Sequence, residues 1–309
     1  MAKVDARFRV AVLGPGAIGG LLAALFWQKG YDVFCIGKKA SVVQIARDGI
    51  YLKSKFFGDL IAHPKAHTKL NEQVDVLFIT VKSPFLVNAI DRIDINCIKN
   101  SVIVPLLNGV GHCEIIRSQL GSRIAVGTIG LVEAKINRKG IICHLSNNKP
   151  HIDIASASDI SEELQKKIID AVKLAGISIS VLATEEEVIW SKLVRLNAIA
   201  SLTAAFQKTI GTIRSDTELR LLLKEIVEEG ALVARFEGVQ IEPEEIVRQI
   251  DLLPKTLKTS LQRDIQRGES SELDAITGGV IKLAKIYGVS LPVHKHVYGL
   301  IKERLASLG

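Results

Sequence analysis

Arg9-Val10-Ala11-Val12-Leu13 runs directly into Gly14-Pro15-Gly16-Ala17-Ile18-Gly19, and this junction decides the fold of the N-terminal half. The first stretch is a short apolar run typical of a buried strand, and the small and apolar residues from Ala17 onward are typical of a helix. In the spacing Gly-x-Gly-x-x-Gly, the first glycine permits a tight turn and the second lets a pyrophosphate approach the backbone. The third allows close packing of strand and helix. The junction predicts a dinucleotide-binding turn formed by Gly14, Gly16, Ala17, Ile18 and Gly19; the alternative is a turn with only a structural role.

The end of the next expected strand indicates which dinucleotide binds. Enzymes that use NAD place Asp or Glu there to hold the ribose hydroxyls. This chain has Gly37-Lys38-Lys39 instead, and two cations suit the 2′-phosphate of NADP. Asp32 stands at the beginning of the strand, where it is better interpreted as a turn residue. We therefore expect NADP as the cofactor, with Lys38 at its phosphate.

The remaining pattern divides the chain into two regimes. Short apolar runs typical of strands alternate with helical stretches, which indicates a mostly parallel sheet covered on both faces. After residue 183 strand signals vanish and amphipathic helices follow. The prediction is an α/β chain with an N-terminal Rossmann-type doubly wound sheet over residues 1–183 and an all-helical domain over 184–309. The expected strands are 8–13, 32–36, 74–81, 102–106, 124–132 and 152–154, and the expected later helices are 185–207, 216–237, 243–253, 257–266, 273–287 and 293–308.

Bulk composition narrows the classes of function. The chain has 309 residues, 48% hydrophobic and 24% charged, an ordinary globular balance for two domains. Its net charge is +7, but the cations are spread along the chain, and few aromatic residues are available for base stacking. A site for anionic small molecules explains the excess better than nucleic acid.

The other global signals concern metals, membranes and the compartment. The four cysteines match no zinc spacing, so we expect no metal and interpret them as buried free thiols of a reducing cytosol. No secretory signal and no apolar run long enough to span a membrane is present, so a soluble cytoplasmic protein is expected. A homodimer is compatible with the apolar helical half, although nothing in the pattern requires one.

Polar side chains follow two of the expected strands, at the edge where doubly wound sheets bind their ligands. One strand ends at Lys82 and another at Asn108-Gly109. Each has a plainer interpretation, since a lysine at a strand end is often simply solvated and Asn-Gly favours a turn.

In the helical half, Lys192 stands in a stretch that is otherwise nearly all apolar. Desolvation lowers the pKa of a lysine, which is how such a group is tuned as a general acid. The alternative is a lysine that extends its ammonium from a buried helix to water. The cluster Ser271-Glu272 has a strong structural interpretation as well, with Ser271 capping the following helix.

Taken together, these motifs resemble the ketopantoate reductase (2-dehydropantoate 2-reductase) family over almost the whole chain. The motif Gly288-Val289-x-x-Pro292 near the end also fits this family. The matched motifs are Gly14-x-Gly16-x-x-Gly19, Thr80-Val81-Lys82, Asn108-Gly109, Trp190-x-Lys192-Leu193, Leu202-Thr203-Ala204, Ser260-Leu261-x-x-Asp264 and Glu272-Leu273-Asp274.

The resemblance implies a Rossmann domain joined to a helical domain, with the site in the cleft between them. It implies that NADPH delivers a hydride to the carbonyl carbon of a small 2-oxo acid, reducing 2-dehydropantoate to pantoate in pantothenate and coenzyme A biosynthesis. Lys192 would protonate the developing alkoxide, and Glu272 would hold the substrate hydroxyl and orient Lys192.

The same resemblance assigns the binding residues. Ser260 would bind the substrate carboxylate, and Asn108 would contribute to the nicotinamide and substrate pocket. Lys82 would lie near cofactor and substrate. Lys38 occupies the place of an arginine in the family and offers a point charge instead of a bidentate fork.

One departure from the family concerns the wall beside Lys192. Members have Asn four and eight residues after the lysine, where this chain has Leu196 and Ala200. Asn197 lies about 140° round the helix from Lys192 and cannot replace the missing side chain. Arg195 lies about 60° from Lys192, and we hypothesise that it supplies a compensating carboxylate contact and lowers the lysine pKa. The alternative is an arginine that faces solvent or another domain.

Three functions follow from these residues. The first is reduction of 2-dehydropantoate. The second is reduction of another 2-oxo acid, which the departures at Leu196 and Ala200 allow. The third is a non-catalytic NADP-binding sensor, against which Lys192 and Glu272 argue because a sensor needs no proton donor.

Overall fold

The computed structural model describes residues 8–121, 123–130, 132–155 and 160–307. The chain forms two compact units: unit 1 comprises Met1–Leu107 and His112–Val188, and unit 2 comprises Asn108–Gly111 and Ile189–Gly309. The division therefore falls after Val188, where the sequence pattern placed it at residue 183. A four-residue loop from the middle of unit 1's sequence packs with unit 2.

The central sheet of unit 1 is parallel and has the strand order β5-β2-β1-β6-β7. In chain order this is 3-2-1-4-5, so the direction of winding reverses at β1, which is the switch point of a Rossmann-type sheet. The expected doubly wound fold is confirmed. The strands are β1 (Arg9–Leu13), β2 (Asp32–Ile36), β5 (Lys65–His67), β6 (Val76–Ile79) and β7 (Val102–Pro105).

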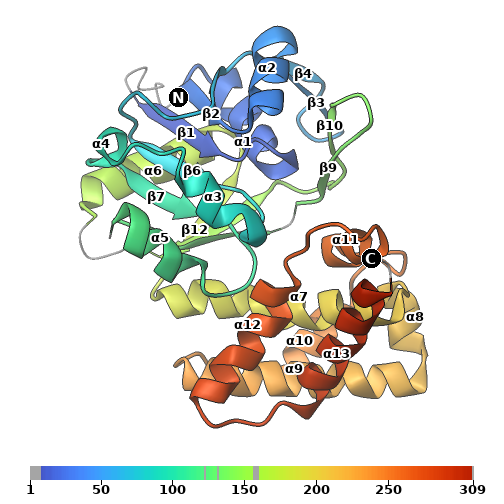
Figure 1. Cartoon of the computed structure of the whole chain (residues 1–309). Coiled ribbons are helices and arrows are strands. Elements are labelled where there is room, and N and C mark those ends of the chain that lie inside the picture. The colour runs from blue at the N-terminus through green and yellow to red at the C-terminus, as the bar shows by residue number, and fades with distance from the viewer. Residues whose placement is uncertain (1–7, 122, 131, 156–159, 308–309) are drawn as a thin grey trace. The chain divides into compact units, whose positions relative to one another are not determined.

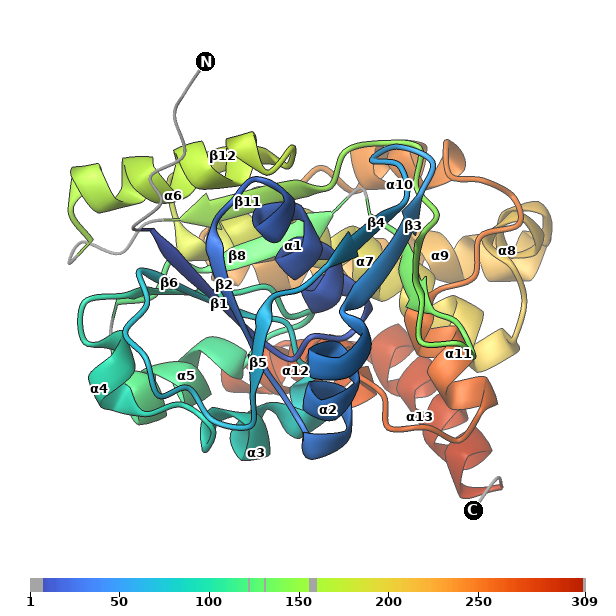
Figure 2. The same cartoon turned by 90° about the horizontal axis from the view of Figure 1, so that it is seen from above.

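Helices cover both faces of this sheet, which explains why β6 is apolar throughout and why β1 and β2 are apolar and buried after their first residue. Figure 2 shows α1 on one side and α3, α4 and α5 on the other. The helices of unit 1 are α1 (Ala17–Gln28), α2 (Lys39–Asp48), α3 (Leu86–Ile90), α4 (Ile95–Ile98), α5 (His112–Leu120) and α6 (Glu162–Leu174), with a 3-10 turn η1 (Ser83–Phe85).

Two smaller sheets complete unit 1. One has the order β4-β3-β10-β9 and the other β12-β11-β8. Of these strands, the sequence pattern indicated only β8 and β11, because the others are short or mix polar with apolar residues. Their bounds are β3 (Ile50–Ser54), β4 (Leu60–Ala62), β8 (Gly127–Gly130), β9 (Ala134–Ile136), β10 (Ile142–His144), β11 (His151–Ala155) and β12 (Ser178–Leu182).

Unit 2 consists of helices packed around an apolar core (Figure 1), and among its described residues no strand occurs. The all-helical prediction is confirmed for residues up to 307; the last expected helix ran to Leu308, which lies outside the described residues. The helices are α7 (Glu185–Phe206), which begins in unit 1, α8 (Ile210–Ser215), α9 (Thr217–Phe236), α10 (Pro243–Asp251), α11 (Ser260–Gln266), α12 (Leu273–Ile286) and α13 (Pro292–Ala306).

The helix α7, which carries Lys192, has well-defined ends. The Thr184 hydroxyl accepts a hydrogen bond from the Glu187 amide, and the Glu187 carboxylate accepts one from the Ala183 amide, both at 3.0 Å. This pair is a variant of the capping box, in which the carboxylate accepts from the residue before the N-cap instead of from the N-cap residue itself. The helix stops before Gln207, whose φ of 54° lies in the left-handed region. Among the described residues, no helix combines the length and apolarity that crossing a bilayer demands.

Candidate functional site

The glycine turn of unit 1 lies at the end of β1, where the sheet reverses its winding. The Gly14 amide donates to the Ile36 carbonyl at 2.9 Å, and the Thr80 amide donates to the Leu13 carbonyl at 3.0 Å. The Thr80 hydroxyl also donates to the Gly14 carbonyl at 2.8 Å. The turn is thus fixed by the ends of β2 and β6 together.

Two of the glycines are required by space and backbone conformation. Gly14 has a φ of 89°, and a Cβ there would overlap the Val81 side chain. A Cβ on Gly19 would overlap both the Gly14 carbonyl and the Thr80 hydroxyl. These observations agree with the tight turn and the close strand–helix packing expected of the two positions.

Gly16 differs from both, because no residue that the structure describes fills the space beside it. A Cβ there would meet only the Gly14 carbonyl, at 4.0 Å, and the residue is exposed. Gly16 is also the N-cap of α1, which has no side-chain cap and no acidic residue in its first turn. An uncapped helix start next to open space fits the pyrophosphate of a dinucleotide.

Lys38 lies at the end of β2, as the N-cap residue of α2. It is exposed, and its Nζ lies 4.8 Å from the centre of the Phe85 ring. Phe85 is 37% exposed and lies in η1, which begins four residues after the last residue of β6, so this pair lies near the ends of the two strands that flank β1. Sequence patterns did not single out Phe85; an aromatic residue just after a strand of the binding edge is the signal that points to it.

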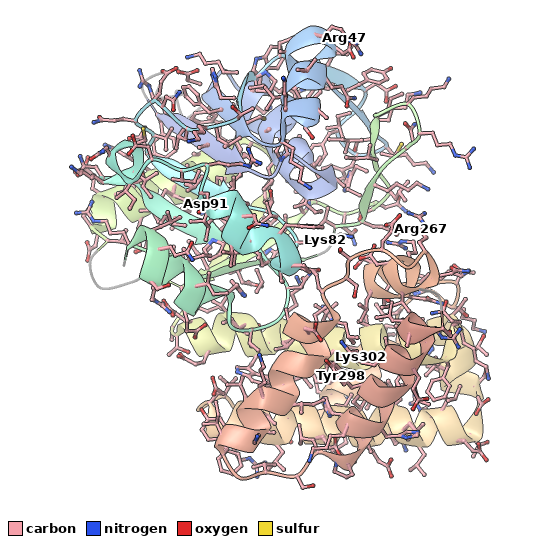
Figure 3. The ribbon with its side chains drawn as sticks, in the orientation of Figure 1. Arg47, Lys82, Asp91, Arg267, Tyr298 and Lys302 are labelled. Carbon is pink, nitrogen blue, oxygen red and sulfur yellow. The ribbon has the colours of Figure 1, made fainter. Side chains whose placement is uncertain are left out.

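Lys82 also lies at this edge of unit 1 (Figure 3). It is half-buried and occupies the N-cap position of η1.

A second group of site residues lies in unit 2. The Lys192 ammonium on α7 donates to Asn108 Oδ1 at 2.8 Å, and Asn108 Nδ2 donates to Glu272 Oε2 at 2.9 Å. The Asn108 amide therefore bridges a cation and a carboxylate, using its acceptor for one and its donor for the other. Glu272 is buried and Lys192 is half-buried, so the carboxylate is largely shielded from bulk water and the lysine is partly accessible.

The position of Glu272 shows that its carboxylate is not used for helix capping. Glu272 is the N-cap residue of α12, yet no side chain caps this helix. The interpretation of Ser271 as the cap is wrong, because α12 begins one residue later than that interpretation requires. The Glu272 carboxylate is directed to Asn108 instead of to the helix amides.

Ser260 and Arg195 lie in unit 2 but are not hydrogen-bonded to this group within the described part of the chain. Ser260 is exposed at the start of α11, which is held to α7 by a hydrogen bond of 2.9 Å between the Thr259 and Thr203 hydroxyls. Arg195 Nη1 donates to Gln249 Oε1 on α10 at 3.2 Å. Burial lowers the pKa of the Arg195 guanidinium.

The residues of α7 that depart from the family pattern give Lys192 no polar neighbour at the two expected positions. Asn197 is buried, its amide lies 2.5 Å from His294 Nε2, and its Oδ1 accepts from the Ser201 hydroxyl at 2.9 Å. It belongs to the helical core, in agreement with the prediction that it does not replace the missing side chain beside Lys192. Leu196 is partly buried and Ala200 buried, so neither position offers a polar group there.

Family models match both units of the chain. The model described as "Ketopantoate reductase PanE/ApbA" covers residues 10–157, and its C-terminal companion covers residues 186–305. The chain belongs to the ketopantoate reductase family.

Relatives with solved structures or curated names agree with this assignment. The chain is 28% identical over 308 residues to the 2-dehydropantoate 2-reductase of Pyrococcus abyssi, covering 97% of this chain and 99% of that one. It superposes with a TM-score of 0.88 and 22% identity on D-mandelate dehydrogenase in a ternary structure with NADH and anilino(oxo)acetate, covering 97% and 99% of the two chains. A dimeric ketopantoate reductase from Staphylococcus aureus has a TM-score of 0.80 and 20% identity, with 98% and 100% covered. The protein is thus an oxidoreductase of the ketopantoate reductase family.

Proposed function

We propose that the protein reduces a small 2-oxo acid to the 2-hydroxy acid with NADPH, and that the acid is 2-dehydropantoate. The observation that carries the proposal is the Lys192–Asn108–Glu272 group, because an ammonium held by an amide and a carboxylate is a prepared proton donor. Binding alone would need no such donor, which argues against a non-catalytic sensor.

The cofactor assignment rests on unit 1. Gly14, Gly16 and Gly19 and the open start of α1 fit a pyrophosphate, and Lys38 supplies a cation for a 2′-phosphate. Lys82 and Asn108 are proposed to lie near the nicotinamide. When bound, the reduced nicotinamide supplies the hydride that adds to the substrate carbonyl carbon.

The residues of unit 2 supply the proton. As the carbonyl oxygen gains negative charge, the Lys192 ammonium transfers a proton to it and is left as a neutral amine, which regains a proton from water. Asn108 Oδ1 fixes the direction of the ammonium, and Glu272 fixes the amide. Ser260 is proposed to bind the substrate carboxylate. Arg195 remains a further candidate for that contact, although its guanidinium is hydrogen-bonded to Gln249.

The test is oxidation of NADPH by the purified protein with a panel of 2-oxo acids. The panel includes 2-dehydropantoate, an aliphatic acid without a hydroxyl, and phenylglyoxylate as an aromatic acid. The highest kcat/KM is expected with 2-dehydropantoate. The absence of turnover with every acid would contradict both enzyme functions.

A second candidate is reduction of another 2-oxo acid, in particular one with an apolar side chain. Leu196 and Ala200 favour it, because an apolar wall cannot hydrogen-bond a substrate hydroxyl. The similarity to D-mandelate dehydrogenase points in the same direction. A kcat/KM for phenylglyoxylate above that for 2-dehydropantoate would establish this candidate.

Lys38→Ala is expected to raise KM for NADPH about 10- to 100-fold and to change KM for NADH little. The reason is that a charge-assisted hydrogen bond to the phosphate is worth about 1.5–3 kcal/mol, and each 1.4 kcal/mol is a factor of about ten. Lys29→Ala serves as the control, because Lys29 is also exposed and lies at the C-terminal end of α1, away from the glycine turn. Equal losses with the two cofactors would remove Lys38 from the 2′-phosphate site.

A further inference from the structure

The loop Asn108–Gly111 carries one member of the proton-donating group, and its packing is unusual for its place in the chain. It follows β7 and precedes α5, which both belong to unit 1, yet it is part of unit 2. Because both neighbours of the loop in the sequence belong to unit 1, the loop must be fixed to unit 2 by tertiary contacts. The contacts of the loop show that the holder is α12.

The loop is joined to the first turns of α12 at three places. The Asn108 side chain donates to Glu272, the N-cap residue. The Val110 amide donates to the Ala275 carbonyl at 3.0 Å. The Val110 side chain lies against Gly279, where a Cβ on the glycine would come within 2.5 Å of Val110 Cγ2.

Two glycines make this close approach possible. Gly109 has a φ of 85°, and a Cβ there would overlap the Ala275 carbonyl, so both conformation and space require glycine. Gly279 leaves a notch in the surface of α12 that the Val110 side chain fills. Glycine inside a helix lowers the stability of the helix by about 1 kcal/mol relative to alanine. At position 279 the glycine makes room for the Val110 side chain.

We propose that the notch at Gly279, with Val110 seated in it, is the device that positions Asn108 and thereby Lys192 for proton transfer. Gly279, Val110 and Gly109 are positioning residues, since they act through Asn108. The two bonds of Asn108 are 2.8 and 2.9 Å long, and hydrogen bonds are lost at about 3.6 Å, so a displacement of the loop by about 1 Å releases both charged partners. The expected effect on turnover rests on the proposed function, whereas the contacts between the loop and α12 do not depend on it.

The decisive variant is Gly279→Ala, compared with Gly278→Ala. The two substitutions add the same methyl group at adjacent positions of one helix, but the methyl group at 278 comes closest to Tyr298 Cε2, at 3.3 Å, and otherwise lies 3.7 Å from Asp274 Oδ1 and the Leu273 carbonyl, so it does not touch the loop. Gly279→Ala is expected to lower kcat about 10- to 100-fold, because a misplacement of about 1 Å costs up to 10² in rate. KM for NADPH is expected to change less than kcat, since the glycine turn and Lys38 are untouched and only Asn108, proposed to lie near the nicotinamide, is displaced.

A rescue separates positioning from general damage. In Gly279→Ala combined with Val110→Ala, the smaller side chain makes room for the new methyl group, and kcat is expected to recover most of the loss. If Gly279→Ala does not fold, Val110→Leu tests the same seat from the loop side, with an unchanged helix and the same expected fall in kcat. A kcat for Gly279→Ala equal to that of Gly278→Ala, or no recovery in the double variant, would overturn the proposal.

A measurement without turnover keeps the proposal distinct from the proposed function. The acylation rate of Lys192 by an N-hydroxysuccinimide ester, followed by peptide mass spectrometry, reports how firmly the amine is held by Asn108. We expect faster acylation in Gly279→Ala than in Gly278→Ala, and the wild-type rate in the double variant. If no 2-oxo acid is reduced, the proposed function fails, but the acylation rates still test whether Val110 and Gly279 position Asn108. Equal acylation rates in the wild type and the three variants would overturn this positioning role.

Discussion

Lys192→Ala is expected to lower kcat by about 10²–10⁴-fold, the contribution that a positioned general acid makes to a proton transfer. The change removes the ammonium that donates to Asn108 but leaves Asn108 bonded to Glu272. NADPH affinity is expected to be unchanged, because the glycine turn and Lys38 belong to unit 1. Steady-state kinetics with the preferred 2-oxo acid and a fluorescence titration with NADPH measure the two quantities.

Two further variants make this prediction specific. Lys192→Arg keeps the positive charge, but a guanidinium does not give up its proton near neutral pH, so it is expected not to restore kcat. Lys302→Ala removes a half-exposed lysine of the same unit (Figure 3) and is expected to retain full activity. A loss below about tenfold in Lys192→Ala, or full activity in Lys192→Arg, would mean that another group protonates the substrate.

The second large effect separates two glycines of the same turn. Gly16→Ala is expected to weaken NADPH binding about tenfold or more, equivalent to at least about 1.4 kcal/mol, because the methyl group occupies the space where the pyrophosphate approaches. The free energy of unfolding is expected to be unchanged or raised, since the position is extended backbone with no neighbour closer than 4.0 Å.

Gly19→Ala is expected to behave in the opposite way. Its methyl group would overlap the Gly14 carbonyl and the Thr80 hydroxyl, so the free energy of unfolding is expected to fall by about 1–3 kcal/mol. Urea unfolding of the cofactor-free variants measures stability, and NADPH titration measures binding. If Gly16→Ala were destabilised as much as Gly19→Ala, or if it bound NADPH normally, the assignment of Gly16 to the pyrophosphate would be wrong.

The cofactor half of the molecule was predictable because its signals are local. The strand β1, the three glycines and the start of α1 are contiguous, and the turn itself requires glycine at positions 14 and 19. By contrast, β5 is three residues long with exposed ends, and no apolar run marks it. Its place at the edge of the sheet comes from pairing with β2, which a sequence pattern does not contain.

In the helical half, the sequence pattern missed one short helix and misjudged the start of another. The short helix α8 was not indicated, although Thr209 is its N-cap and accepts from the Thr212 amide. Six residues are too few for a periodic pattern. Ser271 was a plausible cap by residue type, but the carboxylate that follows it makes a tertiary contact instead.

The three residues of the proposed proton-donating group are far apart in the sequence. Asn108 is separated from Lys192 by 84 positions and from Glu272 by 164, so no spacing rule brings the three together. Their roles came from the resemblance to a family, residue by residue. The seat of Val110 against Gly279 was not anticipated at all, because a glycine inside a helix gives no indication of which side chain will fill its place.

The exchange of Asn108–Gly111 between the two units has a consequence for recombination. A chimera that joins residues 1–188 of this chain to the helical unit of a relative would take this loop from one parent and α12 from the other. Unless the second parent also has a small residue in place of Gly279, Val110 would collide with a foreign side chain. In such a chimera we expect both units to fold but turnover to be lost. Replacing residues 108–111 by the corresponding loop of the second parent is expected to restore turnover.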